Sequence, residues 1–118
     1  MGVAYHGHYF VWFEIGRTEL MRELGCDYGL LEDRDQLFFP VVDARARYLS
    51  PARYDDLLTV TTRLTRVGGV RVCFEYTIER EGEAGVLATG YTEHAAVGAD
   101  GRPRRMPAGV RQCLSVRT

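Results

Sequence analysis

Two histidines and two tyrosines crowd the start of this chain, just before an apolar helical pattern: Tyr5, His6, His8 and Tyr9. Histidines at this spacing can bind a metal ion, but a third and fourth ligand are not apparent, because His94 is distant in the sequence. We therefore expect no metal. Taken alone, His6 is typical of a histidine that caps or packs a helix start, and His8 of a polar residue at the helix entrance.

A second candidate group lies near the C-terminal end, where arginines cluster: Arg102, Arg104, Arg105, Arg111 and Arg117. Such a cluster is typical of a solvated surface, or it binds an anionic small ligand. The whole chain has 15 basic against 16 acidic residues. This balance creates no field strong enough to recruit nucleic acid or an anionic membrane by charge alone.

The cysteines and the short apolar runs indicate the cellular location of the protein. Cys26, Cys73 and Cys113 are far apart and odd in number, which indicates reduced cysteines and not a disulfide framework or zinc site. The apolar runs are too short to cross a bilayer, and no charged-then-apolar leader precedes Gly2. We expect a cytoplasmic protein of 118 residues that forms a single domain, 1–118.

The N-terminal part of the sequence has the apolar periodicity of a helix. Apolar residues at three- and four-residue steps predict a helix over 10–24, ended by Gly25 as its C-terminal cap. Gly16 lowers the helix propensity by about 1 kcal/mol relative to alanine, so we expect the backbone to approach something closely there. Residues 28–35 predict one more short helical turn, and Pro107 predicts the first turn of a terminal helix.

After Pro40 the apolar period becomes two, which predicts strands. They are expected at 41–49, 57–67, 70–80 and 86–97. The pair Gly68 and Gly69 predicts a hairpin turn, and Gly90 is a possible bulge. One long helix and tightly linked strands predict an α+β domain with an antiparallel sheet. Because one helix covers one face only, we expect a dimer.

Spaced motifs over nearly the whole chain resemble the hotdog-fold acyl-CoA thioesterases of the 4-hydroxybenzoyl-CoA thioesterase type. The matching residues are Gly2, Tyr5, His6, Tyr9, Glu14, Arg17, Thr18, Glu19, Tyr48, Pro51, Ala52, Arg53, Asp55 and Asp56. The resemblance implies a long central helix wrapped by an antiparallel sheet. It also implies hydrolysis of an acyl-CoA thioester without metal or redox cofactor, by a homodimer or homotetramer whose active sites lie at the dimer interface.

Members of this family begin with an edge strand and then a Thr-Asp-x-x-Gly segment whose aspartate performs the catalysis. Aligned on Gly2, that aspartate would lie three residues earlier, before Met1. We therefore expect Met1 to be an internal methionine taken as the start, with the edge strand and the aspartate upstream. The alternative is a degenerate protein that has lost both.

The resemblance also implies roles for residues that are present. The backbone amide of His6 would polarise the thioester carbonyl, and its imidazole would orient water or the aspartate. Tyr5 and Tyr9 would line the pocket, and Gly2 would contact substrate. Glu14 is the best substitute carboxylate, because it lies two helical turns beyond His6, although it could instead pair with helix-surface neighbours.

Coenzyme A requires fixed cations for its phosphates, and the candidates are Arg71, Arg102, Arg104 and Arg105. The sequence does not identify the acyl group. A rival hypothesis is a non-catalytic hotdog module that binds acyl-CoA or a protein partner. The absent aspartate favours the module, and the retained motif at Gly2, Tyr5, His6 and Tyr9 favours the enzyme.

Overall fold

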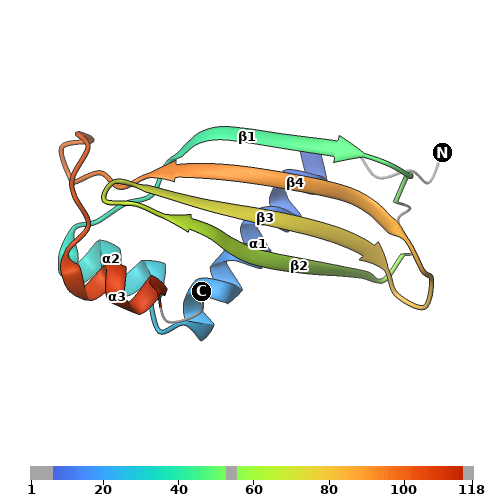
Figure 1. Ribbon diagram of the computed structural model, residues 1–118, viewed down its shortest axis with the longest axis horizontal. Helices are drawn as coiled ribbons and strands as arrows, with labels where there is room; N and C mark the ends of the chain where they lie inside the picture. The colour runs from blue at the N-terminus through green and yellow to red at the C-terminus, as the bar shows by residue number, and fades with distance from the viewer. Residues whose placement is uncertain (1–6, 53–55, 116–118) are drawn as a thin grey trace.

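A computed structural model describes residues 7–52 and 56–115. The elements in order are α1 (Gly7–Glu23), α2 (Tyr28–Asp35), β1 (Val41–Tyr48), β2 (Leu58–Val67), β3 (Arg71–Arg80), β4 (Val86–Ala95) and α3 (Ala108–Ser115). The strands form one antiparallel sheet in the order β1-β4-β3-β2 (Figure 1). The predicted α+β class is confirmed.

The element boundaries follow the local signals in the sequence. The predicted first helix is present and begins three residues earlier than expected, and Gly25 follows it with a φ of 83°. Asp27 caps the second helix, because its carboxylate accepts hydrogen bonds from the backbone N–H groups of Gly29 and Leu30. The predicted hairpin is also confirmed, since the N–H of Gly68 donates to the carbonyl of Arg71.

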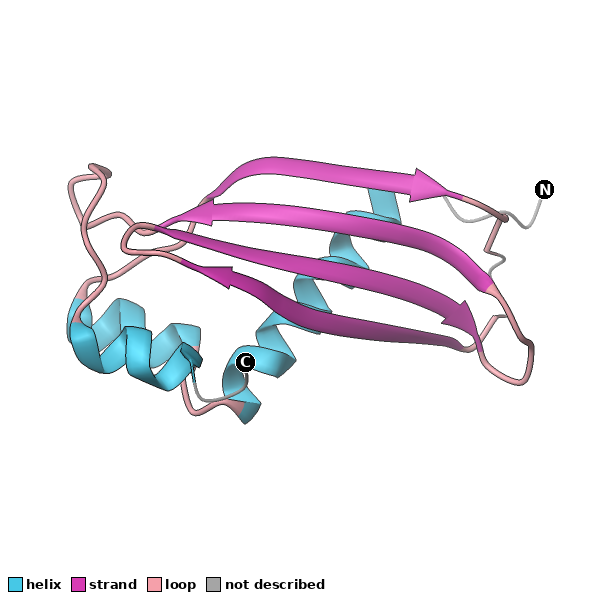
Figure 2. Cartoon of the chain, viewed as in Figure 1, coloured by secondary structure: helices cyan, strands magenta, loops and turns pink. Residues whose placement is uncertain are grey.

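The long helix α1 crosses one face of the sheet and packs against β2 and β3. Figure 2 shows α1 crossing behind the strands, α2 and α3 at one end of the sheet, and the front face bare of helices. β3 alternates accordingly, with buried Val72, Phe74, Tyr76 and Ile78 on the α1 side. The expected uncovered face is therefore present in the described chain.

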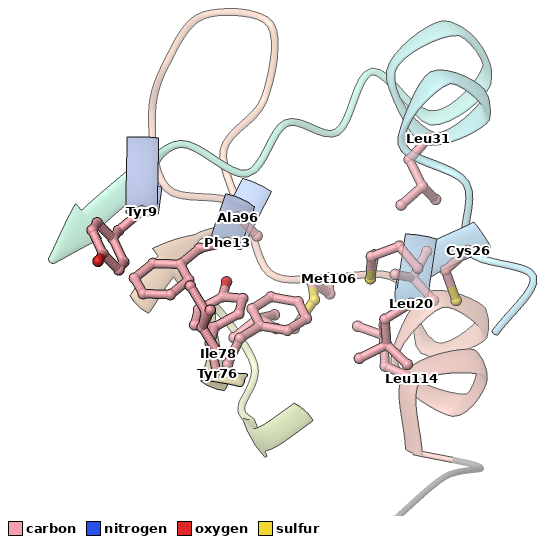
Figure 3. Packing of buried hydrophobic residues seen from close by; sticks show 14 of the residues in the cluster. Tyr9, Phe13, Leu20, Cys26, Leu31, Tyr76, Ile78, Ala96, Met106 and Leu114 are labelled. Carbon is pink, nitrogen blue, oxygen red and sulfur yellow. The ribbon is translucent and has the colours of Figure 1, made fainter. Parts of the chain in front are cut away.

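Phe13 is the aromatic centre of the core. Its side chain is fully buried and stacks on Tyr76 with ring centroids 4.5 Å apart (Figure 3). The ring lies directly over Gly90, where an added Cβ would be 2.2 Å from a Phe13 carbon. The predicted bulge at Gly90 is wrong. Gly90 pairs in register with Ala46 and Tyr76, and it is a glycine because Phe13 occupies the space of a side chain.

Gly16 allows the second close approach between helix and sheet. A Cβ at this position would lie 2.3 Å from Oγ1 of Thr62 and 3.1 Å from Cγ1 of Val60. The predicted close backbone approach is confirmed, and its partner is β2. The absent side chain offsets the low helix propensity of glycine, because it brings the backbone of α1 against the strand.

A chain of buried hydrogen bonds crosses the core beside Phe13. The Tyr76 hydroxyl lies 2.6 Å from Oγ1 of Thr92, which lies 2.9 Å from Nε2 of His94. Nδ1 of His94 is 3.0 Å from the carbonyl oxygen of Phe39. Because a carbonyl only accepts, Nδ1 carries the proton and Nε2 is free to accept from Thr92. Every member of the chain is therefore satisfied with His94 neutral.

The cysteines differ from expectation. Cys26 and Cys113 form a disulfide across 87 residues of sequence, with their Cα atoms 6.5 Å apart, while Cys73 is free and buried. The prediction of three reduced cysteines is wrong for this pair. Spacing could not reveal the pair, because only the packing of α3 near the end of α1 brings the two residues together.

Within residues 7–52 and 56–115, no helix is long and apolar enough to span a membrane. The same residues contain no cluster of three or more histidine, cysteine or acidic side chains that could hold a metal ion.

We predict that Gly90→Ala lowers the free energy of unfolding by about 1–3 kcal/mol, because the new methyl group would overlap the Phe13 ring. The matched control is Gly109→Ala in α3, where an added Cβ meets nothing within 4 Å. Urea unfolding should show a loss for the first variant and none for the second. Equal stability of Gly90→Ala and the parent would contradict the assigned contact.

We also predict a pH dependence of stability that originates at His94. Burial lowers the pKa of His94 below its ordinary value of 6.5, and Arg17 adds to this, while the hydrogen bond to Phe39 opposes it. The unfolded chain therefore takes up a proton at a higher pH than the folded protein does. The contribution is complete above pH 6.5 and is lost as the pH falls from there toward the folded pKa.

The measurement is urea unfolding across this pH range for the parent and for His94→Gln. This variant replaces the titrating imidazole with a neutral polar amide. The parent should lose stability more steeply than the variant as the medium is acidified. Identical slopes would show that His94 does not cause the dependence.

Candidate functional site

The first turn of α1 directly follows several of the predicted site residues in the sequence. Gly2, Tyr5 and His6 lie outside the described residues, and α1 begins directly after them at Gly7. A helix start has backbone N–H groups without intrahelical partners and the positive end of the helix dipole. The first turn of α1 contains no acidic residue to neutralise it. This end of α1 can therefore polarise a carbonyl or stabilise a developing oxyanion.

Tyr9 fixes this turn against the rest of the fold. Its side chain is buried, and its hydroxyl accepts a hydrogen bond from the backbone N–H of Ala52 at 3.2 Å. Its ring meets Trp12 and Tyr48 edge-on, at centroid distances of 4.9 and 4.7 Å. Tyr9 thus joins α1 to the segment after β1. That it also contacts substrate stays a prediction.

Glu14 lies further along α1, at a polar hollow between α1 and α2. The hollow has a volume of about 310 Å³ and is lined by Glu14, Arg17, Thr18, Tyr28, Glu32 and Phe39. The Glu14 side chain is exposed, with Arg17 and Thr18 on the same side of the helix. The structure therefore brings the candidate carboxylate, a guanidinium and a phenol to one opening, where they can bind a polar group and exchange a proton with it.

Arg17 acts electrostatically on two phenols. Burial raises the pKa of Tyr28 above its ordinary value, and the nearby Arg17 guanidinium opposes that shift. Burial likewise raises the pKa of Tyr76, against the hydrogen bond with Thr92 and the charge of Arg17. Both phenols keep their protons at neutral pH and can act as donors. Arg17 thereby links the hollow to the buried chain that ends at His94.

The four arginines predicted for coenzyme A do not gather at the start of α1. Arg71 pairs with Glu93 at 3.1 Å, Arg105 packs on Gly69 and Arg102 is exposed. Figure 1 shows the hairpin before β3 and the loop after β4 at the end of the sheet where α2 and α3 lie, away from the first turn of α1. A phosphate contact by these arginines stays a prediction.

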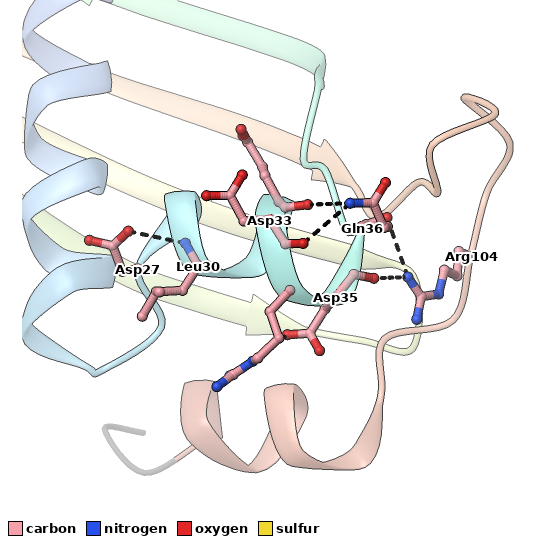
Figure 4. A network of polar contacts seen from close by, with 8 residues as sticks. Asp27, Leu30, Asp33, Asp35, Gln36 and Arg104 are labelled. Carbon is pink, nitrogen blue, oxygen red and sulfur yellow. Dashed lines mark hydrogen bonds and ion pairs between the residues drawn. The ribbon is translucent and has the colours of Figure 1, made fainter.

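Arg104 has a contact that its predicted role did not include. Its Nη1 donates to the carbonyl oxygen of Asp35 at 2.5 Å and to that of Gln36 at 3.3 Å (Figure 4). These carbonyls end α2, where intrahelical partners run out, and Gln36 itself has a left-handed φ of 52°. Arg104 therefore ties the loop after β4 to the end of α2.

Sequence reasoning missed the role of Arg17 and of the two phenols. The only signal was the three-residue spacing between Glu14 and Arg17 among the residues that match the family, which placed Arg17 near the candidate carboxylate. Tyr28 and Tyr76 are 48 positions apart and carry no mark in the sequence. Only the packing of α1 against both α2 and the sheet brings them to Arg17.

Comparison with known sequences identifies relatives of the chain. The sequence pattern of the thioesterase superfamily matches residues 1–87. The putative acyl-CoA thioesterase YneP of Bacillus subtilis is 37% identical over 90 residues, covering 75% of this chain and 64% of the relative. The acyl-CoA thioesterase YbgC of Haemophilus influenzae is 38% identical over 79 residues, covering 67% and 58%. The chain thus spans less than two thirds of the length of either relative.

Solved structures agree with these relatives. A hypothetical protein from Thermus thermophilus, TT1821, superposes with a TM-score of 0.90 at 35% identity, covering 98% of this chain and 87% of that one. A DHNA-CoA thioesterase from Staphylococcus aureus superposes with a TM-score of 0.82 at 33% identity, covering 89% and 70%. These matches confirm the predicted hotdog fold and the resemblance to hotdog-fold acyl-CoA thioesterases. The chain belongs to the thioesterase superfamily.

Proposed function

We propose that this protein hydrolyses an acyl-CoA thioester to a free acid and coenzyme A. The observation that carries the proposal is the superfamily match over residues 1–87, together with relatives named as acyl-CoA thioesterases. In the reaction, the oxygen of water bonds to the thioester carbonyl carbon and the carbon–sulfur bond breaks. The proton lost by water ends on the coenzyme A sulfur.

The start of α1 supports this chemistry. Attack on the carbonyl places negative charge on its oxygen, and free N–H groups at a helix start stabilise such a charge without reorganising. In the proposal the amide of His6 polarises the carbonyl, the His6 imidazole orients water, and Tyr5, Gly2 and Tyr9 border the substrate. We propose the exposed Glu14 as the general base, because it is the first carboxylate of α1 after the helix start.

We further propose that two copies assemble through the edge strand β1. This strand has apolar side chains open to solvent in the single chain, among them Val41 at 46% and Val42 at 48% exposure. α1 adds exposed Val11 and Ile15. A strand at the edge of the described sheet with exposed apolar side chains favours pairing with a second copy. The dimer would place an active site at the shared interface, and two dimers would form a tetramer.

Two further parts of the proposal concern cofactors and cellular location. Hydrolysis of a thioester by water requires neither a metal ion nor a redox cofactor, and we propose that the protein uses none. We also propose a cytoplasmic location on the basis of the substrate class alone. The cysteines do not support that location, because Cys26 and Cys113 form a disulfide.

The second candidate function is a non-catalytic hotdog module that binds acyl-CoA or a protein partner. The exposed apolar residues of β1 and α1 favour it to the same extent as they favour a dimer. The two functions differ in one observable, which is turnover.

We predict that the chain releases free thiol from members of a panel of aliphatic and aromatic acyl-CoA thioesters. Glu14→Gln should lower kcat by about 10²–10⁴-fold, because it removes the proposed base and keeps the side-chain shape. The matched control is Glu19→Gln on the same helix, where Glu19 pairs with Arg22 at the surface. Full activity in Glu14→Gln would exclude Glu14 as the base. Substrate binding with no thiol release by the parent would favour the binding module.

We predict that Val42→Lys converts the dimer into a monomer, because a charge at the proposed β1 interface would be buried without a partner. Light scattering coupled to gel filtration measures the mass. Leu57→Lys is the control, since Leu57 is 70% exposed and precedes β2 at the opposite edge of the sheet. A dimer that persists in Val42→Lys would place the interface elsewhere.

A further inference from the structure

The bare face of the sheet is hollowed. Figure 2 shows this face in front, with α1 behind it. The hollow has a volume of about 550 Å³ and takes lining residues from all four strands of the described sheet. A volume of this size is within the range of small-molecule sites, roughly 300–1,000 Å³. Because α1 lies on the other side of the sheet, this hollow is separate from the site proposed for thioester hydrolysis.

Two cross-strand rows of side chains form the hollow, and their members point to the same face because they are two residues apart on each strand. The first row, from β1 to β2, is Arg47, Thr89, Thr77 and Thr61. The second row is Arg45, Tyr91, Glu75 and Arg63. All eight line the hollow, which therefore presents hydroxyl and guanidinium donors around one aromatic ring.

The charges in the hollow are unevenly compensated. Arg63 pairs with Glu75 at 3.0 Å, and Arg45 pairs with Asp43 at 3.1 Å. Arg47 is exposed and forms no ion pair or hydrogen bond with any residue in the described part of the chain. Five donors of its guanidinium are thus open to a ligand, next to the hydroxyl of Thr89. The β1 side of the hollow carries an uncompensated positive charge.

The second row offers a surface for a planar group. The Arg45 guanidinium lies over the Tyr91 ring, with 5.8 Å between its central carbon and the ring centroid. Tyr91 is half-buried, and its hydroxyl is held by Glu93 at 3.1 Å. A guanidinium that lies over an aromatic ring can stack with a further flat, conjugated ring. The hollow therefore combines an anion-binding end with a stacking surface one row away.

We propose that this hollow binds an organic phosphate of nucleotide type. The phosphate contacts Arg47 and the Thr89 hydroxyl, because arginine matches phosphate oxygens with paired donors. The base lies against Arg45 and Tyr91. A free nucleotide and the nucleotide portion of coenzyme A share this chemistry. The proposal does not depend on the proposed hydrolysis, since it rests on the opposite face of the sheet.

The test is calorimetric titration of the whole chain with AMP at low ionic strength. We expect saturable binding that weakens as salt is added, because an exposed charge contact is screened. Arg47→Gln should weaken it about tenfold or more, and Arg47→Lys by less. Arg34→Gln on α2 is the control, because it removes an arginine whose side chain is 74% exposed outside the hollow. It should leave AMP binding unchanged.

Three results would overturn the assignment. They are no saturable AMP binding, equal AMP binding in folded Arg47→Gln and the parent, and inorganic phosphate that binds as tightly as AMP. Coenzyme A added to the AMP complex distinguishes the two sources. Displacement of AMP assigns the hollow to the nucleotide portion of coenzyme A, and retention assigns it to a free nucleotide. Thiol release measured on the same variants reports separately on hydrolysis.

Discussion

The close approach of α1 to the sheet is the constraint on which the rest of the molecule depends. Two glycines allow it from opposite sides: Gly16 in the helix faces Thr62 of β2, and Gly90 in β4 lies under the Phe13 ring. A helix held this closely buries its aromatic face and leaves its first turn at a fixed place. Tyr9 then secures that turn through Ala52, so the helix start is positioned by packing and by one hydrogen bond.

The same approach also encloses a polar chain. Tyr76, Thr92 and His94 lie within the core, and the chain is tolerated because each polar atom has a partner. Arg17 lines the hollow that contains Glu14, and its charge opposes the burial that raises the pKa of Tyr76. The described site thus consists of a helix start and the polar hollow further along the same helix. One rigid element positions both, which is a favourable arrangement for chemistry that needs fixed geometry.

Local patterns in the sequence predicted the elements, because periodicity and turn residues act over a few positions. They correctly placed both helices of the N-terminal part, the hairpin and the close approach at Gly16. They failed where the cause lay between distant segments. Gly90 looked like a bulge because Phe13, which fills its space, is 77 positions away. Two other contacts depend likewise on packing that sequence spacing does not encode. They are the disulfide between Cys26 and Cys113 and the hydrogen bond from Arg104 to the end of α2.

The central claim is that the start of α1 holds the thioester carbonyl. The most direct measurement is a crystal structure of the protein with a non-hydrolysable acyl-CoA analogue. In this analogue a methylene group separates the sulfur from the carbonyl carbon, so that a ketone replaces the thioester. The account predicts that the ketone oxygen accepts hydrogen bonds from backbone N–H groups at the first turn of α1, next to His6. A ketone bound elsewhere, with that turn facing only solvent, would contradict it.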